Sequence, residues 1–189
     1  PILSEKKINK KTVFVIEASS YQLEYSKFFK SKYSVILNIS ADHLERHGNI
    51  KNYINAKFNL LENQTKDAIA FINNQDSNIK KKILSKRFNF EIIKVDTNKI
   101  NNLIKSLNNE YFYSKGNKEN LSFILAISKR LNIHSEIILK ILKKFKGLNY
   151  RQQIIHNNKN IKIINDSKST SFASTESLLK DLKNVYWIL

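Results

Sequence analysis

Three side chains that could handle a metal ion or a phosphate follow apolar segments in the first third of the chain. Glu17 closes an apolar, β-branched run over residues 13–16. His43 follows a second such run over residues 34–39, and Lys57 lies on the helix expected after it. Open α/β sheets bind their ligands beyond the carboxyl ends of the strands. Glu17 and His43 are therefore expected where such a sheet would place its chemistry.

The types of these residues limit what they could do. A carboxylate such as Glu17 suits Mg²⁺, which takes oxygen ligands, and a histidine such as His43 can bind a metal or polarise a phosphate. A lysine ammonium has three donors and no acceptor, so Lys57 cannot bind a metal directly. Lys57 must therefore either contact a phosphate or be chemically modified. Taken singly, Glu17 also fits a helix-capping acid, and Lys57 an exposed helix lysine.

A second polar segment, residues 165–170, reads N-D-S-K-S-T and stands between an expected strand and an expected helix. Polar side chains beside helix N–H groups favour an anion or nucleotide site. A simple turn capped by Asp and Ser fits the segment equally well. Upstream, Arg151 could hold a phosphate through two parallel hydrogen bonds, or it could form a surface ion pair. Local chemistry leaves both alternatives open.

The elements that must position these residues alternate along the first half of the chain. Continuous apolar runs predict strands that are covered on both faces, and segments with helical spacing follow them. This alternation is typical of an α/β fold with a mostly parallel sheet flanked by helices. The expected strands are residues 12–16, 33–39, 67–72 and 90–95, and the expected helices are residues 20–30, 49–62 and 74–88. Residues 40–49 are expected to form a polar loop.

The next part of the chain predicts mainly helix. Residues 111–113 are expected as a short edge strand. Two amphipathic helices are expected over residues 117–131 and 135–145, with Ser135 as the N-cap of the second. Gly147 ends this part, because glycine is the usual residue just beyond a helix.

The pattern restarts after Gly147, which predicts a domain boundary. We expect residues 1–147 to form the end of one domain and residues 148–189 the beginning of another α/β domain. Both ends of the sequence look cut, so the chain is expected to be an internal fragment. The second part should contain a hairpin of residues 152–156 and 161–164, a helix over 171–183 and a strand over 185–189.

Composition excludes some classes of protein. The 189 residues contain no cysteine, so disulfides and thiolate metal sites are excluded, and no apolar run is long enough to span a membrane. The net charge of +17 could indicate a nucleic-acid partner. The lysines, however, are spread along the whole chain, and arginine, the usual reader of guanine and phosphate, is scarce. We therefore expect a solvated basic surface and no nucleic-acid partner.

Taken together, the polar segments resemble the Mur ligases in order and approximate spacing. The S-S-Y-Q-L-E segment, residues 19–24, resembles the D-glutamate-adding branch and differs from the sibling branches and from folylpolyglutamate synthase. The segments are I-E-A-S-S-Y-Q-L-E (16–24), L-N-I-S-A-D-H-L-E-R-H-G (37–48), Y-I-N-A-K (53–57), G-N-K-E-N (116–120), G-L-N-Y-R (147–151) and I-I-N-D-S-K-S-T (163–170).

The resemblance implies a cytoplasmic, ATP-dependent amide ligase of peptidoglycan synthesis. ATP would phosphorylate the L-alanine carboxylate of UDP-N-acetylmuramoyl-L-alanine, and the amine of D-glutamate would attack the resulting acyl phosphate. Mg²⁺, in two sites, would neutralise the transferring phosphoryl group. The chain would supply part of the central ATP-binding domain and the start of a Rossmann-like C-terminal domain. The full-length protein would be a monomer.

The resemblance also implies roles for the metal side of the site. Glu17 matches a ligand of a Mg²⁺ that bridges ATP phosphates, and His43 matches a ligand of the second Mg²⁺ or of the acyl phosphate. Lys57 matches the carbamylated lysine of the family, whose modified side chain offers oxygen ligands in place of an ammonium. Ser19 and Gln22 match residues that face the muramoyl substrate.

Further matches lie on the nucleotide side. Asn120 matches a nucleotide-contacting asparagine. Arg151 and Asp166 match residues that hold the phosphates and the ribose or adenine. Lys168 and Thr170 match a loop close to the γ-phosphate and the incoming D-glutamate, which makes Lys168 a catalytic candidate with His43 and Lys57.

The chain departs from the family pattern at several positions. Tyr150 stands where histidine is usual, Gln153 where glutamate is usual and Ser171 where asparagine is frequent, and Gly116 stands directly before Asn117 without the usual histidine. These changes affect the positioning of the nucleotide base and remove no expected metal ligand.

The glycine-rich phosphate loop of such ATPases is also missing from the sequence. The three glycines are Gly48, Gly116 and Gly147, and none belongs to a G-K-[ST] loop. The family carries that loop upstream of the matched segments, so the fragment alone is expected to be inactive. Two alternatives stay open: a sibling or folylpolyglutamate-synthase-like ligase that adds another amino acid, and a non-enzymatic basic domain that binds nucleic acid.

Overall fold

The computed structural model describes residues 8–41, 43–170, 172–180 and 182–188. Its centre is a parallel sheet in the order β1-β2-β3, made of Tyr33–Ile36, Ile69–Asn73 and Glu91–Val95. In the register of the sheet, Phe71 lies between Val35 and Ile93. Every residue of β2 is buried, as expected for a parallel strand with both faces covered. The α/β fold predicted from the sequence is therefore confirmed.

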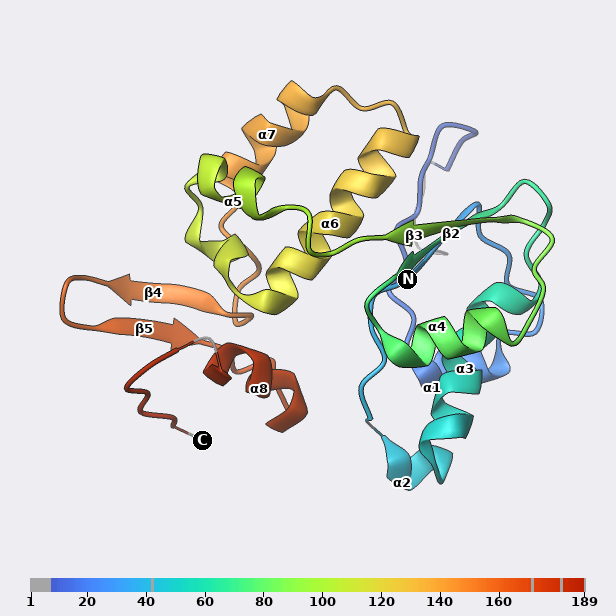
Figure 1. Cartoon of the computed structure of the whole chain (residues 1–189), viewed down its shortest axis with the longest axis horizontal. Helices are drawn as coiled ribbons and strands as arrows, with labels where there is room; N and C mark the ends of the chain where they lie inside the picture. The colour runs from blue at the N-terminus through green and yellow to red at the C-terminus, as the bar shows by residue number, and fades with distance from the viewer. Residues whose placement is uncertain (1–7, 42, 171, 181, 189) are drawn as a thin grey trace.

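Two helices cover one face of the sheet (Figure 1). They are α3 (Ile50–Glu62) and α4 (Ser77–Leu84), which connect β1 to β2 and β2 to β3. Parallel connections cross over with one hand, so successive crossovers in a 1-2-3 sheet place both helices on the same side. Apolar residues at helical spacing on α3 pack there with strand residues and with α4, and the cluster includes Ile36, Tyr53, Phe58, Leu61, Ile72 and Ile79.

The opposite face is covered by α6 (Lys115–Arg130). Phe123 of this helix is 2% exposed and packs against Ile69 and Phe71 of β2. The other side of α6 joins a second core with three short elements that surround Leu121. These elements are α5 (Asn101–Leu107), the 3₁₀ helix η2 (Glu110–Tyr113) and α7 (Ser135–Lys144).

The last part of the chain forms an antiparallel hairpin and a helix. Strands β4 (Gln153–Asn157) and β5 (Lys162–Asn165) pair with each other, which confirms the predicted hairpin. Its turn is held by the Asn158 side chain, which accepts the backbone N–H groups of residues 160 and 161. Helix α8 (Phe172–Lys180) follows the hairpin and contacts α6.

Two predicted strands do not form. Residues 12–16 are irregular, and Val13 and Val15 are 83% and 96% exposed. Residues 185–188 are likewise irregular, and Leu189 lies outside the described residues. The composition of both segments is typical of strands, but a strand also needs a neighbour for its hydrogen bonds. In the part of the chain that the structure describes, neither segment has such a neighbour.

Smaller differences concern helix types and helix ends. Residues 111–113 belong to η2 and not to an edge strand, because the Asn109 side chain caps a tight helical turn that buries Phe112. Helix α1 (Ser20–Tyr25) ends earlier than predicted, and α8 ends before residue 183. The N-cap of α7 is His134, one residue before the predicted Ser135. Helix α2 (Leu44–His47) lies where a loop was expected, and α5 lies in a segment for which the sequence predicted no element.

In the part of the chain that the structure describes, no helix is long and apolar enough to cross a membrane.

Candidate functional site

Side chains that follow β2 hold the loop that follows β1. Asn73, at the end of β2, donates to the Leu37 carbonyl at 3.0 Å. The Asp76 carboxylate accepts the Ile39 N–H at 2.8 Å through one oxygen and the Ile79 N–H at 2.9 Å through the other, the second bond capping α4. The loop that leads to His43 is therefore fixed to the carboxyl edge of the sheet.

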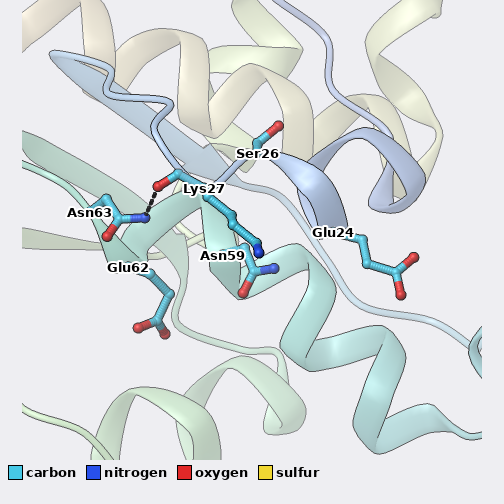
Figure 2. A pocket seen from close by; sticks show the side chains of 6 residues that line it. All are labelled: Glu24, Ser26, Lys27, Asn59, Glu62 and Asn63. Atoms are coloured by element: carbon cyan, nitrogen blue, oxygen red, sulfur yellow. Dashed lines mark hydrogen bonds between the residues drawn. The ribbon is translucent and has the colours of Figure 1, made fainter.

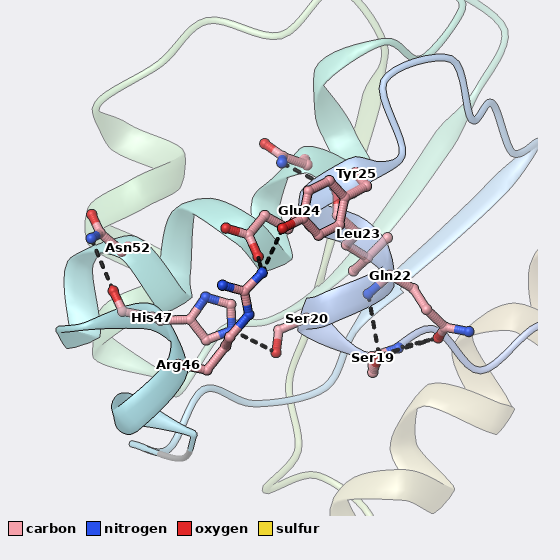
Figure 3. Close-up of polar contacts among 10 residues, drawn as sticks. Ser19, Ser20, Gln22, Leu23, Glu24, Tyr25, Arg46, His47 and Asn52 are labelled. Atoms are coloured by element: carbon pink, nitrogen blue, oxygen red, sulfur yellow. Dashed lines mark hydrogen bonds and ion pairs between the residues drawn. The ribbon is translucent and has the colours of Figure 1, made fainter.

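Ser19 and Gln22, the residues predicted to face the muramoyl substrate, form a capping box at the start of α1 (Figure 3). The Gln22 side chain accepts the Ser19 backbone N–H at 2.9 Å, and the Ser19 hydroxyl accepts the Gln22 backbone N–H at 3.3 Å. Such a reciprocal pair satisfies two N–H groups of the helix end. Both side chains are exposed, so the box presents its outer surface to solvent.

His43 is the N-cap residue of α2 and has a left-handed conformation, with φ at 53°. Its ring is exposed and lies 5.0 Å from the ring of Tyr21, measured between ring centres. Residues other than glycine adopt positive φ uncommonly, so this turn aims the imidazole in a direction that a regular helix start would not. The turn brings His43 beside α1.

A continuous row of rings links His43 to Lys57. We call Tyr21, His43, His47 and Tyr53 the aromatic array. His47 stacks on Tyr21 with ring centres 5.6 Å apart and meets Tyr53 edge-on at 5.4 Å. The Lys57 nitrogen lies 5.1 Å from the centre of the Tyr53 ring, within the range of a cation–π interaction. The structure thus places the predicted residues His43 and Lys57 at opposite ends of one array.

The sequence pattern contains a signal for the array. His43 and His47 are four residues apart, and so are Tyr53 and Lys57. Residues at this spacing share a helix face. The expectation of a loop over residues 40–49 hid the first pair, since α2 occupies four residues of that loop.

Glu17 is exposed and precedes the capping box in an irregular segment. Among the residues that the structure describes, no group of three or more His, Cys, Asp or Glu could hold a metal ion. Glu17 and His43 alone therefore make an incomplete ligand set. The chemistry of the donors fits Mg²⁺ only if a modified Lys57 and oxygens of a bound phosphate complete it.

The predicted nucleotide residues gather around the N-terminal end of α6. Asp166 accepts the backbone N–H of Gln152 at 2.9 Å. The side chain of Gln152 in turn accepts from the Ser114 hydroxyl at 2.8 Å and from the Asn117 amide at 3.1 Å. Ser114 is the N-cap of α6, and Asn120 is exposed in the first turns of the same helix.

Arg151 is exposed between two residues with positive φ, Tyr150 at 65° and Gln152 at 46°. The Tyr150 carbonyl accepts the backbone N–H of Lys168 at 3.0 Å. We call residues 150–152 the linker. The linker is thus bonded to the turn that carries Asp166 and Lys168. Thr170 is exposed at the end of that turn.

Burial and nearby charges affect the ionisation of Glu119 on α6. The pKa of Glu119 is raised, chiefly because burial disfavours its charged form. Lys115 lowers the pKa of Glu119, and the negative charge of Asp76 raises it. Asp76 is therefore near enough to Glu119 for the two charges to interact.

A polar pocket of about 410 Å³ lies beside α1 and α3 (Figure 2). We distinguish this pocket from the candidate site. Its side chains serve to join these two helices. Asn59 and Asn63 donate to backbone carbonyls at the end of α1 and just beyond it, and Glu24 and Glu62 pair with Arg46 and Lys86. We therefore give this pocket a structural role within the domain.

Residues 2–151 match the family described as Mur ligase middle domain. A protein from Rickettsia bellii named UDP-N-acetylmuramoylalanine--D-glutamate ligase is 29% identical over all of this chain and 46% of its own length. A protein of the same name from Clostridioides difficile is 35% identical over 88% of this chain and 41% of its own length. The crystal structure of MurF from Acinetobacter baumannii superposes with a TM-score of 0.61 at 17% identity, covering 86% of this chain and 39% of that one. The chain thus spans less than half the length of these proteins.

Proposed function

The chain belongs to the Mur ligase family, and on that premise we propose that the whole protein joins D-glutamate to UDP-N-acetylmuramoyl-L-alanine at the expense of ATP. The observation that carries the proposal is the match to relatives named for this reaction over nearly the whole chain. The protein would work in the cytoplasm as a monomer in peptidoglycan synthesis. Residues 1–147 would end its central domain, and residues 148–189 would begin its C-terminal domain.

In the proposed reaction, the terminal phosphoryl group of ATP passes to the L-alanine carboxylate, and ADP leaves. The neutral amine of D-glutamate then attacks the acyl carbon. The new carbon–nitrogen bond forms, the carbon–oxygen bond to the phosphate breaks, inorganic phosphate leaves, and the nitrogen loses a proton. Positioning and charge neutralisation supply most of the catalysis in phosphoryl transfer. The chain's residues would therefore act mainly by holding the two substrates in line.

The metal side would consist of Glu17, His43 and carbamylated Lys57, with Mg²⁺ in two sites. When bound, Mg²⁺ would neutralise the charge on the transferring phosphoryl group. Carbamylation forms a bond between the neutral Lys57 amine and the carbon of CO₂, with loss of one proton. The capping box of Ser19 and Gln22 would face the muramoyl substrate.

The nucleotide side would consist of Asn120, Arg151 and Asp166, with Lys168 and Thr170 near the γ-phosphate and D-glutamate. The bonds from Asp166 and Lys168 to the linker at Tyr150–Gln152 support this grouping, because they keep Arg151 beside the turn. Arg151 is well suited to the task, since a guanidinium can hold a phosphate through two parallel bonds.

Phosphate release by the whole protein tests the proposal. We expect release to require ATP, UDP-N-acetylmuramoyl-L-alanine and D-glutamate together. Equal rates with another amino acid would instead indicate a sibling ligase, and ATP-independent binding of nucleic acid with no phosphate release would favour the basic binding domain. Lys57→Ala should abolish release, whereas Lys51→Ala, an exposed lysine on the same helix, should leave it unchanged.

A further inference from the structure

His47 is a buried ionisable side chain with no role in the reaction described above. It is 6% exposed, and its Nε2 atom shares a hydrogen bond of 3.0 Å with the hydroxyl of Ser20, which is 3% exposed (Figure 3). Buried polar groups require a partner, and this bond satisfies both side chains at once. It also ties the end of α2 to the first residue of α1.

The ring of His47 contacts two further helical residues. Tyr21 of α1 stacks on it with an interplanar angle of 23°, and Tyr53 of α3 meets it at 62°. Stacked and edge-on pairs at these distances attract each other beyond simple burial. His47 thus joins α1, α2 and α3, the three helices that carry the proposed substrate and metal-side residues.

Each neighbour of His47 contacts one of those residues in turn. Tyr21 lies 5.0 Å from the His43 ring, and Tyr53 lies under the Lys57 nitrogen at 5.1 Å. A displacement of the His47 ring would therefore be transmitted to His43 on one side and to Lys57 on the other.

We propose that His47 is a positioning residue that sets the placement of His43 and Lys57 for the metal–phosphate site. The inference rests on the proposed function, because it assumes that these two residues act together. Residues that orient the direct ligands of a metal typically contribute about 10- to 100-fold to metal affinity or activity. The loss of the His47 ring should have an effect of that size.

The first measurement needs no activity. In the whole protein labelled with ¹³C at the lysine ε-carbons, the Lys57 signal should be shifted upfield by the Tyr53 ring, and Lys57→Arg assigns that signal. His47→Ala should abolish the upfield shift, and His47→Phe, which keeps a ring in the array, should retain most of it. His134→Ala, a change to an exposed histidine, should leave the signal in place.

The second measurement is the Mg²⁺ dependence of phosphate release. His47→Ala should raise the Mg²⁺ concentration for half-maximal release by about tenfold or more, with the KM for D-glutamate little changed, and His47→Phe should restore part of the loss. If His47→Ala lowers the unfolding midpoint but leaves the Lys57 signal and the Mg²⁺ dependence as in the wild type, His47 only packs the core and the proposal is wrong.

Two further results distinguish a failure of this proposal from a failure of the proposed function. If His47→Ala does not fold, Ser20→Ala removes only the hydrogen-bond partner and should shift the Lys57 signal and the Mg²⁺ dependence in the same direction but less. An unchanged Lys57 signal in that variant counts against the proposal. If the wild-type protein releases no phosphate, the proposed function fails, whereas the NMR arm still decides whether His47 positions Lys57.

Discussion

The carboxylate of Asp166 accepts the backbone N–H of Gln152 at 2.9 Å, and its other oxygen accepts the Ser169 hydroxyl at 2.8 Å. One half-buried side chain thus closes the turn after β5 and fastens it to the linker that carries Arg151. The link is formed although Gln152 itself has a positive φ of 46°. The bond to Asp166 therefore helps to stabilise a linker conformation that a glutamine rarely adopts.

Asp166→Ala should destabilise the hairpin and its attachment to α6. The change leaves the Gln152 N–H and the Ser169 hydroxyl without their acceptor, which costs about 1–3 kcal/mol. Urea unfolding should show this loss, and hydrogen exchange should show faster exchange of the Gln152 amide. Asp166→Asn keeps one acceptor oxygen and should lose less. Equal stability of the Ala variant and the wild type would show that this bond contributes nothing.

Gly147→Ala should be more destabilising than Gly48→Ala. Both glycines have positive φ, 78° and 75°, so an added Cβ strains either backbone by about 1–3 kcal/mol. At Gly147 the Cβ would also collide with the Tyr111 ring, which cannot move freely because it packs edge-on against Phe112 and Phe145. At Gly48 nothing lies within 4 Å of the added atom.

The difference between the two glycine variants isolates the collision, because the backbone cost is shared. Overpacking of this kind costs about 1–3 kcal/mol, so the Gly147 variant should have the lower free energy of unfolding by that amount. Urea denaturation of the two variants measures it. Matching free energies in both variants would mean that the Tyr111 ring can yield without cost.

Asp76→Ala should lower stability through two lost bonds. The carboxylate caps α4 by accepting the Ile79 N–H, and it holds the loop after β1 by accepting the Ile39 N–H. An N-cap contributes about 0.5–2 kcal/mol, and an unsatisfied N–H in the loop adds about 1–3 kcal/mol. Urea unfolding should give a loss of about 1.5–5 kcal/mol from these two terms, and Asp76→Asn should give a smaller one. A loss of only about 0.5–2 kcal/mol, the contribution of the N-cap alone, would show that the loop is held by other bonds.

The sequence predicted the parts of the fold in which local pattern and burial agree. The run around Ile69–Asn73 is apolar because both faces of β2 are covered, and α3 repeats apolar residues every three or four positions because one side faces the sheet. Residues 12–16 have a similar composition but form no strand in the part that the structure describes. Composition reports what a segment could bury, whereas a strand also depends on a neighbour that is distant in sequence.

The candidate site likewise has parts that could be predicted from the sequence and parts that could not. Family resemblance pointed to His43 and Lys57, and the structure adds that a row of rings joins them. The spacing of His43 and His47 is visible in the sequence, but the contacts of His47 with α1 and α3 are not, because they join residues that are distant along the chain. Asp76 was missed for a similar reason, since its partner Ile39 is 37 residues away.

Glu119 and Asp96 should change the free energy of unfolding with pH in opposite directions. Burial raises the pKa of Glu119, so between its usual pKa and the raised value the folded state binds more protons than the unfolded state. The free energy of unfolding must then fall as pH rises through that window. Below the usual pKa of Glu119 both states are protonated, so this group causes no change of the free energy of unfolding with pH there.

Urea unfolding of Glu119→Gln over a series of pH values tests this sign. The amide does not titrate, so the stability of the variant relative to the wild type should increase as pH rises through the window. The control is Asp96→Asn. The backbone N–H of Asn98 lowers the pKa of Asp96, so this carboxylate stabilises the fold above its usual pKa, and its contribution is lost as pH falls through the lowered value. Parallel pH profiles for the wild type and Glu119→Gln would show that Glu119 titrates alike in the folded and unfolded states.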